Sequence, residues 1–75
     1  MLPNRHYVSD AKWLEEQLSM LPTTIALETC GKYSSAYRHA FDNEPLEHKK
    51  ENAGRKAANT RLRVFVQAMK SENWN

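Results

Sequence analysis

The stretch Glu44–Lys70, EPLEHKKENAGRKAANTRLRVFVQAMK, decides the fold that this sequence predicts. Pro45 suits the first turn of a helix because its missing N–H would have no partner there, and Glu47 favours the positive end of the helix dipole. From Asn52 to Lys70 the stretch has five basic residues and no acidic one. We therefore expect one long helix over residues 44–70, with a strongly basic flank.

At 100° per residue, the apolar side chains of this helix fall on one broad arc and most of its basic side chains fall opposite. The apolar arc contains Ala57, Ala58, Leu62, Val64, Phe65, Ala68 and Met69. The opposite side contains Lys49, Lys56, Asn59, Arg63 and Lys70. We expect the first set to face the core and the second set to face solvent.

Two residues do not fit this pattern. Gly54 lies inside the helix, where it costs roughly 1 kcal/mol relative to alanine, and it indicates a bend or a close helix crossing. Arg61 falls inside the apolar arc. Either its aliphatic stem lies along the core while its guanidinium reaches water, or it pairs with a carboxylate of another helix, such as Glu28 or Asp42. A ligand-binding role is the third alternative.

The 75 residues make at most one domain, and a core of this size rarely supplies more than ~3–5 kcal/mol of stability. A second copy or a partner protein would supply further burial. The net charge of +2 is unevenly distributed. Residues 1–31 contain two basic and four acidic side chains, whereas residues 32–75 contain nine basic and five acidic ones. Such a chain suits an acidic partner or head-to-tail pairing with itself.

The residues before 44 predict two more helices. Residues 1–8 form an extended lead-in, in which Tyr7 and Val8 are expected to fold back over the first helix. Ser9 or Asp10 is a good N-cap for a helix over residues 10–21, which Pro22 ends. The inward stripe of this helix is Ala11, Leu14, Leu18 and Leu21.

The second predicted helix covers residues 23–41. Its inward side chains follow a 4-3-4-3 spacing: Ala26, Cys30, Tyr33, Tyr37 and Ala40. Gly31 leaves open a break into two shorter helices. The connection to the next helix is so short that it forces an antiparallel hairpin. The sequence therefore predicts an all-α, three-helix protein, in which a long antiparallel hairpin of helices two and three is crossed by a shorter N-terminal helix and followed by a frayed tail, residues 71–75.

No residue pattern indicates catalysis, and we expect no enzyme, no cofactor and no metal. His6, His39 and His48 lack the paired spacing of metal ligands. Cys30 has no disulfide partner and lies about 180° around its helix from His39, so the two cannot form a catalytic pair. No run of ~18 apolar residues and no signal peptide is present. We therefore expect a cytoplasmic protein that contacts no membrane and no small-molecule ligand.

Two functions remain. A nucleic acid or an acidic partner would lie along a basic face made of Lys49, Arg55, Lys56, Asn59, Arg63 and Lys70. A protein partner or a second copy would use a candidate interface made of Trp13, Met20, Arg61 and Trp74. We favour protein binding or homodimerisation, because the core is small and does not need these apolar groups. Cations on the outer face of a helix commonly serve only to keep it soluble.

Three runs support a family resemblance: KYSSAYRHAF at Lys32–Phe41, EPLEHKKEN at Glu44–Asn52 and AANTRLRVFV at Ala57–Val66. The block that contains them, residues 31–66, resembles small uncharacterised proteins encoded in bacteriophages and prophages. The resemblance implies a bacterial cytoplasm and an accessory role in phage DNA replication, regulation or host takeover. It assigns no catalytic motif and no site residue.

Overall fold

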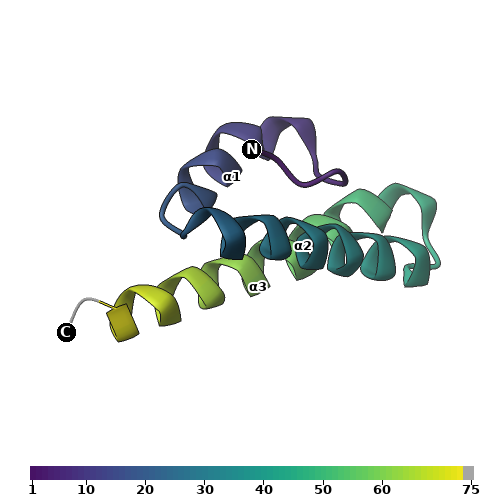
Figure 1. Cartoon of the computed structure of the whole chain (residues 1–75). Helices are drawn as coiled ribbons and strands as arrows, with labels where there is room; N and C mark the ends of the chain where they lie inside the picture. Colours follow the sequence, from purple (N-terminus) through teal and green to yellow (C-terminus); the bar gives the residue numbers. More distant parts are fainter. Residues whose placement is uncertain (74–75) are drawn as a thin grey trace.

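A computed structural model describes residues 1–73 of the chain, and these residues form helices and turns without a β-strand (Figure 1). The three α-helices are α1 (Ala11–Leu18), α2 (Thr23–Asn43) and α3 (Lys50–Asn73). A 3-10 helix precedes α1 at Val8–Asp10, and another precedes α3 at Glu47–Lys49. The predicted all-α, three-helix fold is confirmed.

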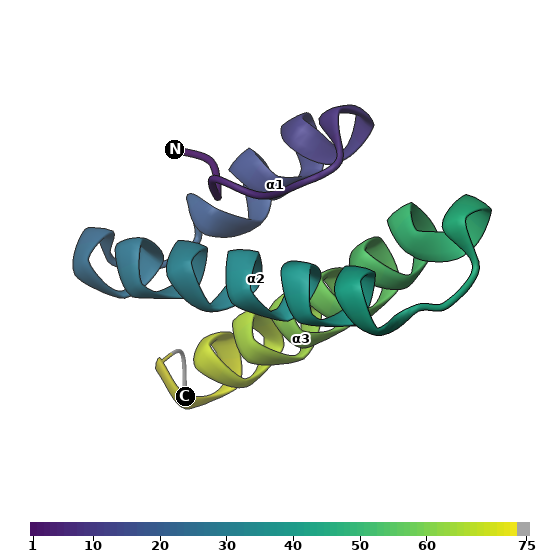
Figure 2. The ribbon, with the colours of Figure 1, turned by 90° about the vertical axis from the view of Figure 1, so that its right-hand side faces the viewer.

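The helices α2 and α3 form the expected antiparallel hairpin, and α1 lies across one side of it (Figures 1 and 2). Lys50 closes the turn of the hairpin, because its Nζ donates to the backbone oxygens of Glu44, at 2.6 Å, and Phe41, at 3.3 Å. A lysine ammonium at the end of α2 satisfies carbonyls that lack a helical partner and interacts favourably with the helix dipole.

Two helix bounds differ from the predicted ones: α3 begins later and α1 ends earlier. Glu44 and Leu46 are extended, with ψ of 118° at both residues, so Pro45 lies in the connection and α3 begins only at Lys50. The first helix ends at Leu18 rather than at residue 21.

The glycine and the tail also differ from expectation. Gly31 does not break α2, which is continuous. The helix α3 continues to Asn73, although a frayed tail was expected from residue 71. Residues 74 and 75 lie outside the described part of the chain.

The core lies between the hairpin and α1. Leu14, Leu18 and Leu21, which the sequence predicts as the inward stripe of the first helix, are buried. The other buried apolar residues include Pro3, Ala26, Tyr33, Ala36, Tyr37, Ala58, Leu62 and Val66. The burial of the two tyrosines and of Leu62 agrees with the sequence, whereas Cys30 is only half-buried.

The stripe along which α3 meets α2 differs from the predicted arc. Its buried residues recur at every fourth position: Gly54, Ala58, Leu62 and Val66. The prediction that Val64 and Ala68 face the core is wrong, since Val64 is 64% exposed and Ala68 is exposed too. Phe65 is 37% exposed. The arc drawn from the sequence therefore mixes residues that face α2 with residues that face outward.

The packing of α2 explains why α3 is rotated about its own axis relative to the predicted orientation. Three buried residues of α2, Thr29, Tyr33 and Tyr37, also recur at every fourth position, and Tyr37 lies against Gly54. Two rows of this kind interdigitate when the helices cross at about 50°, and Figure 2 shows α2 and α3 crossing. A Cβ atom at Gly54 would lie 2.8 Å from the Cδ1 and Cε1 atoms of Tyr37. Of the two alternatives predicted for Gly54, the close helix crossing is the one observed.

Candidate functional site

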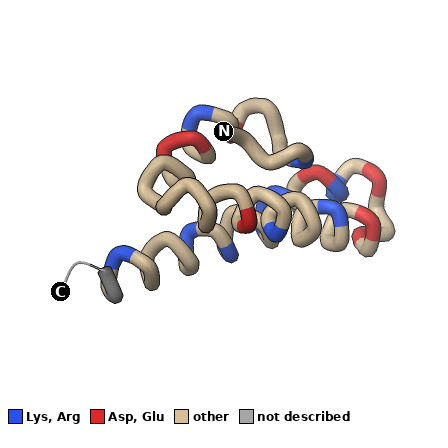
Figure 3. The backbone as a smooth tube through the Cα atoms, viewed as in Figure 1, with Lys and Arg blue, Asp and Glu red and all other residues tan. Residues whose placement is uncertain are grey.

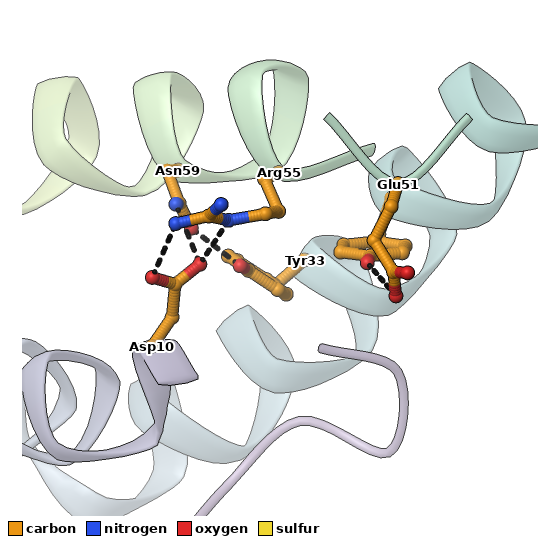
Figure 4. A network of polar contacts seen from close by, with 6 residues as sticks. Asp10, Tyr33, Glu51, Arg55 and Asn59 are labelled. Atoms are coloured by element: carbon orange, nitrogen blue, oxygen red, sulfur yellow. Dashed lines mark hydrogen bonds and ion pairs between the residues drawn. The ribbon is translucent and has the colours of Figure 1, made fainter. Parts of the chain in front are cut away.

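A cluster of polar side chains joins the three helices on the side of the hairpin that the N-terminal segment covers (Figure 4). Arg55 donates from Nε to Oδ2 of Asp10, at 2.9 Å, and from Nη2 to Oδ1, at 3.0 Å. Nδ2 of Asn59 donates to Oδ2 of the same carboxylate at 3.2 Å, and the hydroxyl of Tyr33 donates to Oδ1 of Asn59. We call Asp10, Tyr33, Arg55 and Asn59 the polar cluster.

The electrostatics of the polar cluster hold it in one protonation state. The hydrogen bond from Arg55 lowers the pKa of Asp10 below its ordinary value of 3.8, although burial acts in the opposite direction. Burial raises the pKa of Tyr33 well above its ordinary value, so its hydroxyl stays a donor at neutral pH. These groups pair with one another, so the polar cluster holds the helices together.

Asp10 has a different role from the predicted one. It lies at the N-cap position of α1, as expected, but its side chain makes no capping hydrogen bond. The carboxylate turns to α3 instead, because Arg55 offers a planar pair of donors that match its two oxygens.

The N-terminal segment contacts the hairpin as well as α1, where the amino group of Met1 pairs with Glu15. The backbone N–H of Arg5 donates to Oγ of Ser34 at 3.0 Å, and its guanidinium lies 4.7 Å from the ring centroid of Phe41. The guanidinium of Arg55 lies 4.4 Å from the ring centroid of Tyr7. Val8 is 79% exposed. The prediction that Val8 packs over the first helix is therefore wrong, whereas Tyr7 is packed against the core.

The six residues of the predicted basic face separate into two groups. Arg55 and Asn59 donate to Asp10 and belong to the polar cluster. Lys49, Lys56 and Arg63 are exposed and Lys70 is half-buried. Lys56, Arg63 and Lys70 follow one another at seven-residue spacing along α3, and Lys49 precedes them in the 3-10 helix; Figure 3 shows basic residues distributed along α3.

The three residues of the predicted interface that the structure describes, Trp13, Met20 and Arg61, do not form one surface. Trp13 is half-buried, and the guanidinium of Arg63 lies 5.7 Å from the centroid of its ring. Met20 is 46% exposed just after α1. Arg61 lies on the other flank of α3, and Trp74 lies outside the described residues. Within residues 1–71, no ion pair joins Arg61 to Glu28 or Asp42, so its guanidinium reaches solvent.

A groove of about 890 Å³ runs between α2 and α3, on the flank of the hairpin away from the N-terminal segment. We call it the hairpin groove. Its apolar lining includes Ile25, Ala36, Ala40, Ala57, Leu62 and Phe65. Its charged and ionisable lining residues are Glu28, Lys32, His39 and Arg61. The alanines leave room for the side chains of an occupant to approach the backbone of both helices.

The hairpin groove was not predicted from the sequence, although the sequence contains a signal for it. The apolar arc of α3 runs from Ala57 through Leu62 to Phe65 and Ala68, which is broader than one neighbouring helix covers. The excess width marks a second apolar flank. Tyr33 connects this flank to the polar cluster, since its ring lines the groove while its hydroxyl donates to Asn59.

Within residues 1–73, no group of three or more His, Cys, Asp or Glu residues is arranged to hold a metal ion. None of the helices in this part of the chain has both the length and the apolar character needed to cross a membrane.

Comparisons with protein-family models, with curated proteins and with solved structures give no match for this chain. What the protein binds must therefore be inferred from its own residues.

Proposed function

We propose that this chain is a small, non-enzymatic binding protein that holds an α-helix of another protein in the hairpin groove. The observation that carries the proposal is the apolar flank that α2 and α3 leave open. Amphipathic helices bind in this way, with their apolar side chains laid into a groove between helices.

The packing of the hairpin supports this reading. Phe65 is 37% exposed in the groove wall, and Ile25, Ala40 and Ala57 are half-buried in its lining. Contiguous exposed apolar groups with a polar rim are typical of interaction sites. A helix in the groove would bury these side chains and add a layer to a core that is small for a folded protein.

A neutral probe tests the proposal. The probe is a fluorescein-labelled amphipathic peptide of about fifteen residues, with leucines on one face and glutamines elsewhere. We expect its fluorescence anisotropy to rise on titration with the protein. Ala57→Gln, which fills the groove, should weaken binding at least roughly tenfold, which corresponds to ~1.4 kcal/mol.

Thr60→Gln is the matched control, because Thr60 is exposed on α3 and does not line the groove. It should leave the affinity unchanged. Equal affinities for the two variants would show that the peptide binds elsewhere. No binding of the peptide to the unmodified protein would overturn the proposal.

A second copy of the chain is the competing occupant. Sedimentation velocity over a wide range of concentrations distinguishes a second copy from a different protein as the occupant. We expect a monomer throughout. A dimer that Ala57→Gln dissociates and Thr60→Gln does not would show that the groove serves self-association, and the hetero-partner proposal would then fail.

Nucleic-acid binding is the second candidate function, and the exposed cations Lys49, Lys56 and Arg63 favour it. Each phosphate contact should add about −0.9 to the slope of log affinity against log salt for duplex DNA. The double change Lys49→Glu, Lys56→Glu tests this candidate without disturbing Arg63, which packs over Trp13. Anisotropy with a labelled duplex should show weaker binding in this variant, and no binding at low salt would remove the candidate.

The proposal extends to the setting of the protein. We assign it to a bacterial cytoplasm, as the product of a phage or prophage, on the resemblance of residues 31–66 to such proteins. In that setting it would act as an accessory factor without a cofactor, through a protein partner.

A further inference from the structure

We infer that the helix held in the hairpin groove is acidic, with carboxylates along both edges of its apolar face. This inference rests on the proposed function, and it names the kind of partner that the groove fits. It follows from the placement of the groove's charged residues.

The groove has a cation on each wall. Lys32 comes from α2 and Arg61 from α3. The hydrogen bond from Tyr33 to Asn59 sets the register of the antiparallel pair, so that Lys32 and Arg61 lie at similar levels on opposite walls. A helix between them would have one cation on each side.

The cation on α3 has no partner of its own in the described chain. The ion pairs among residues 1–71 join Asp10 to Arg55 and the terminal amino group of Met1 to Glu15. Glu28 is the acidic residue among the groove's lining, and it lies one helical turn from Lys32 on α2. Among residues 1–71, Glu28 makes no ion pair with Lys32, so Lys32 and Arg61 both offer a charge to an occupant, and a carboxylate beside either would complete an ion pair.

The lining also sets the length and the apolar pattern of the occupant. On α2 it runs from Ile25 to Ala40, about 22 Å along the axis, which is the length of roughly four helical turns. Ile25 and Phe65 narrow one end of the groove, whereas Ala36, Ala40 and Ala57 line the other. The larger apolar side chains of the occupant should therefore lie at the alanine end.

Charge variants of the neutral probe test the inference. In one peptide the glutamines that flank the leucine face are replaced by glutamates, and in another they are replaced by lysines. We expect the glutamate peptide to bind more tightly than the neutral one by roughly two- to fivefold per ion pair formed, and the lysine peptide to bind more weakly. High salt should reduce both differences.

Reversing the charges on the two walls of the groove should reverse the preference for the glutamate peptide over the lysine peptide. The double change Lys32→Glu, Arg61→Glu should make the protein favour the lysine peptide. Lys49→Glu, Lys56→Glu makes the same change in net charge on residues outside the groove and should preserve the preference for glutamate. Circular dichroism of both variants confirms that the helices remain.

The results distinguish a failure of the acidic-partner inference from a failure of the proposed function. Equal binding of the three peptides, or an equal effect of the two double changes, overturns the acidic-partner inference and leaves the groove as a helix-binding site. Failure of all three peptides to bind overturns the inference together with the proposed function. Tight binding of the glutamate peptide that Ala57→Gln does not weaken would place the acidic helix on another surface and overturns the inference too.

Discussion

Arg55 donates two hydrogen bonds to the carboxylate of Asp10, a residue 45 positions earlier in the chain. The pair is partly shielded from water, since the Asp10 side chain is 14% exposed and the Arg55 side chain 34%. It joins the start of α1 to the second turn of α3. The hydrophobic burial of Leu14 and Leu18 supplies the affinity of α1 for the hairpin, and this pair fixes its position.

The first prediction concerns this carboxylate. Asp10→Asn removes the charge that Arg55 binds and should lower the free energy of unfolding by about 1 kcal/mol, because an ion pair that is partly open to water contributes less than a fully buried one. Urea denaturation followed by circular dichroism measures the change. Glu16→Gln is the control, since Glu16 is an exposed carboxylate on α1, and it should change stability by less than about 0.5 kcal/mol.

The second prediction concerns pH. Because the pKa of Asp10 is lower in the folded chain than its ordinary value of 3.8, its stabilisation is complete above that value and is lost as the pH falls through the lowered one. The stability difference between the unmodified protein and Asp10→Asn should therefore be constant from neutral pH to about pH 5. It should shrink in more acidic solution. A difference that stayed constant through the acid range would show that the carboxylate is not stabilised by Arg55.

Local sequence patterns predicted much of the fold because the decisive interactions are local. The 3.6-residue period of Leu14, Leu18 and Leu21 identified the buried stripe of α1, and the short connection after α2 required the hairpin. The rotation of α3 was not predictable in this way. It depends on the contact between Tyr37 and Gly54, which are far apart in sequence, and no helical wheel of one segment contains it.

The candidate site was predicted less well for the same reason. Asn59 looked like an outward polar residue, but it bonds to Asp10 and Tyr33, which belong to other elements. Arg61 was recognised as an anomaly in the apolar arc, and the structure places it in the groove wall. The groove itself arises where two crossing helices leave part of each apolar arc uncovered, which requires the relative position of both helices.

The third prediction compares the two glycines. Gly54→Ala places a Cβ atom 2.8 Å from buried ring carbons of Tyr37, an overpacking that costs ~1–3 kcal/mol and exceeds the helix-propensity gain of ~1 kcal/mol. We expect a net loss of about 1 kcal/mol. Gly31→Ala meets no atom within 4 Å and should instead stabilise the protein by up to ~1 kcal/mol. Denaturation midpoints that moved in the same direction for both variants would contradict the close crossing.

The fourth prediction separates the two roles of Tyr33. Tyr33→Phe removes the hydroxyl that donates to Asn59 but keeps the ring that lines the groove. The free energy of unfolding should fall by about 1 kcal/mol, because a partly buried acceptor loses its donor. The affinity for the neutral leucine peptide should stay within about twofold, since the apolar surface is kept.

Tyr37→Phe is the matched comparison for this change. Its hydroxyl meets Glu51 only at 3.5 Å, a distance at which hydrogen bonds are weak, so we expect a smaller loss of stability. Urea denaturation and peptide anisotropy on the two variants measure both quantities. Equal losses of stability would mean that the hydrogen bond from Tyr33 to Asn59 contributes no more to the free energy of unfolding than the weak contact of Tyr37. A large loss of peptide affinity in Tyr33→Phe alone would instead mean that the polar cluster and the groove are coupled, and that α1 responds when the groove is filled.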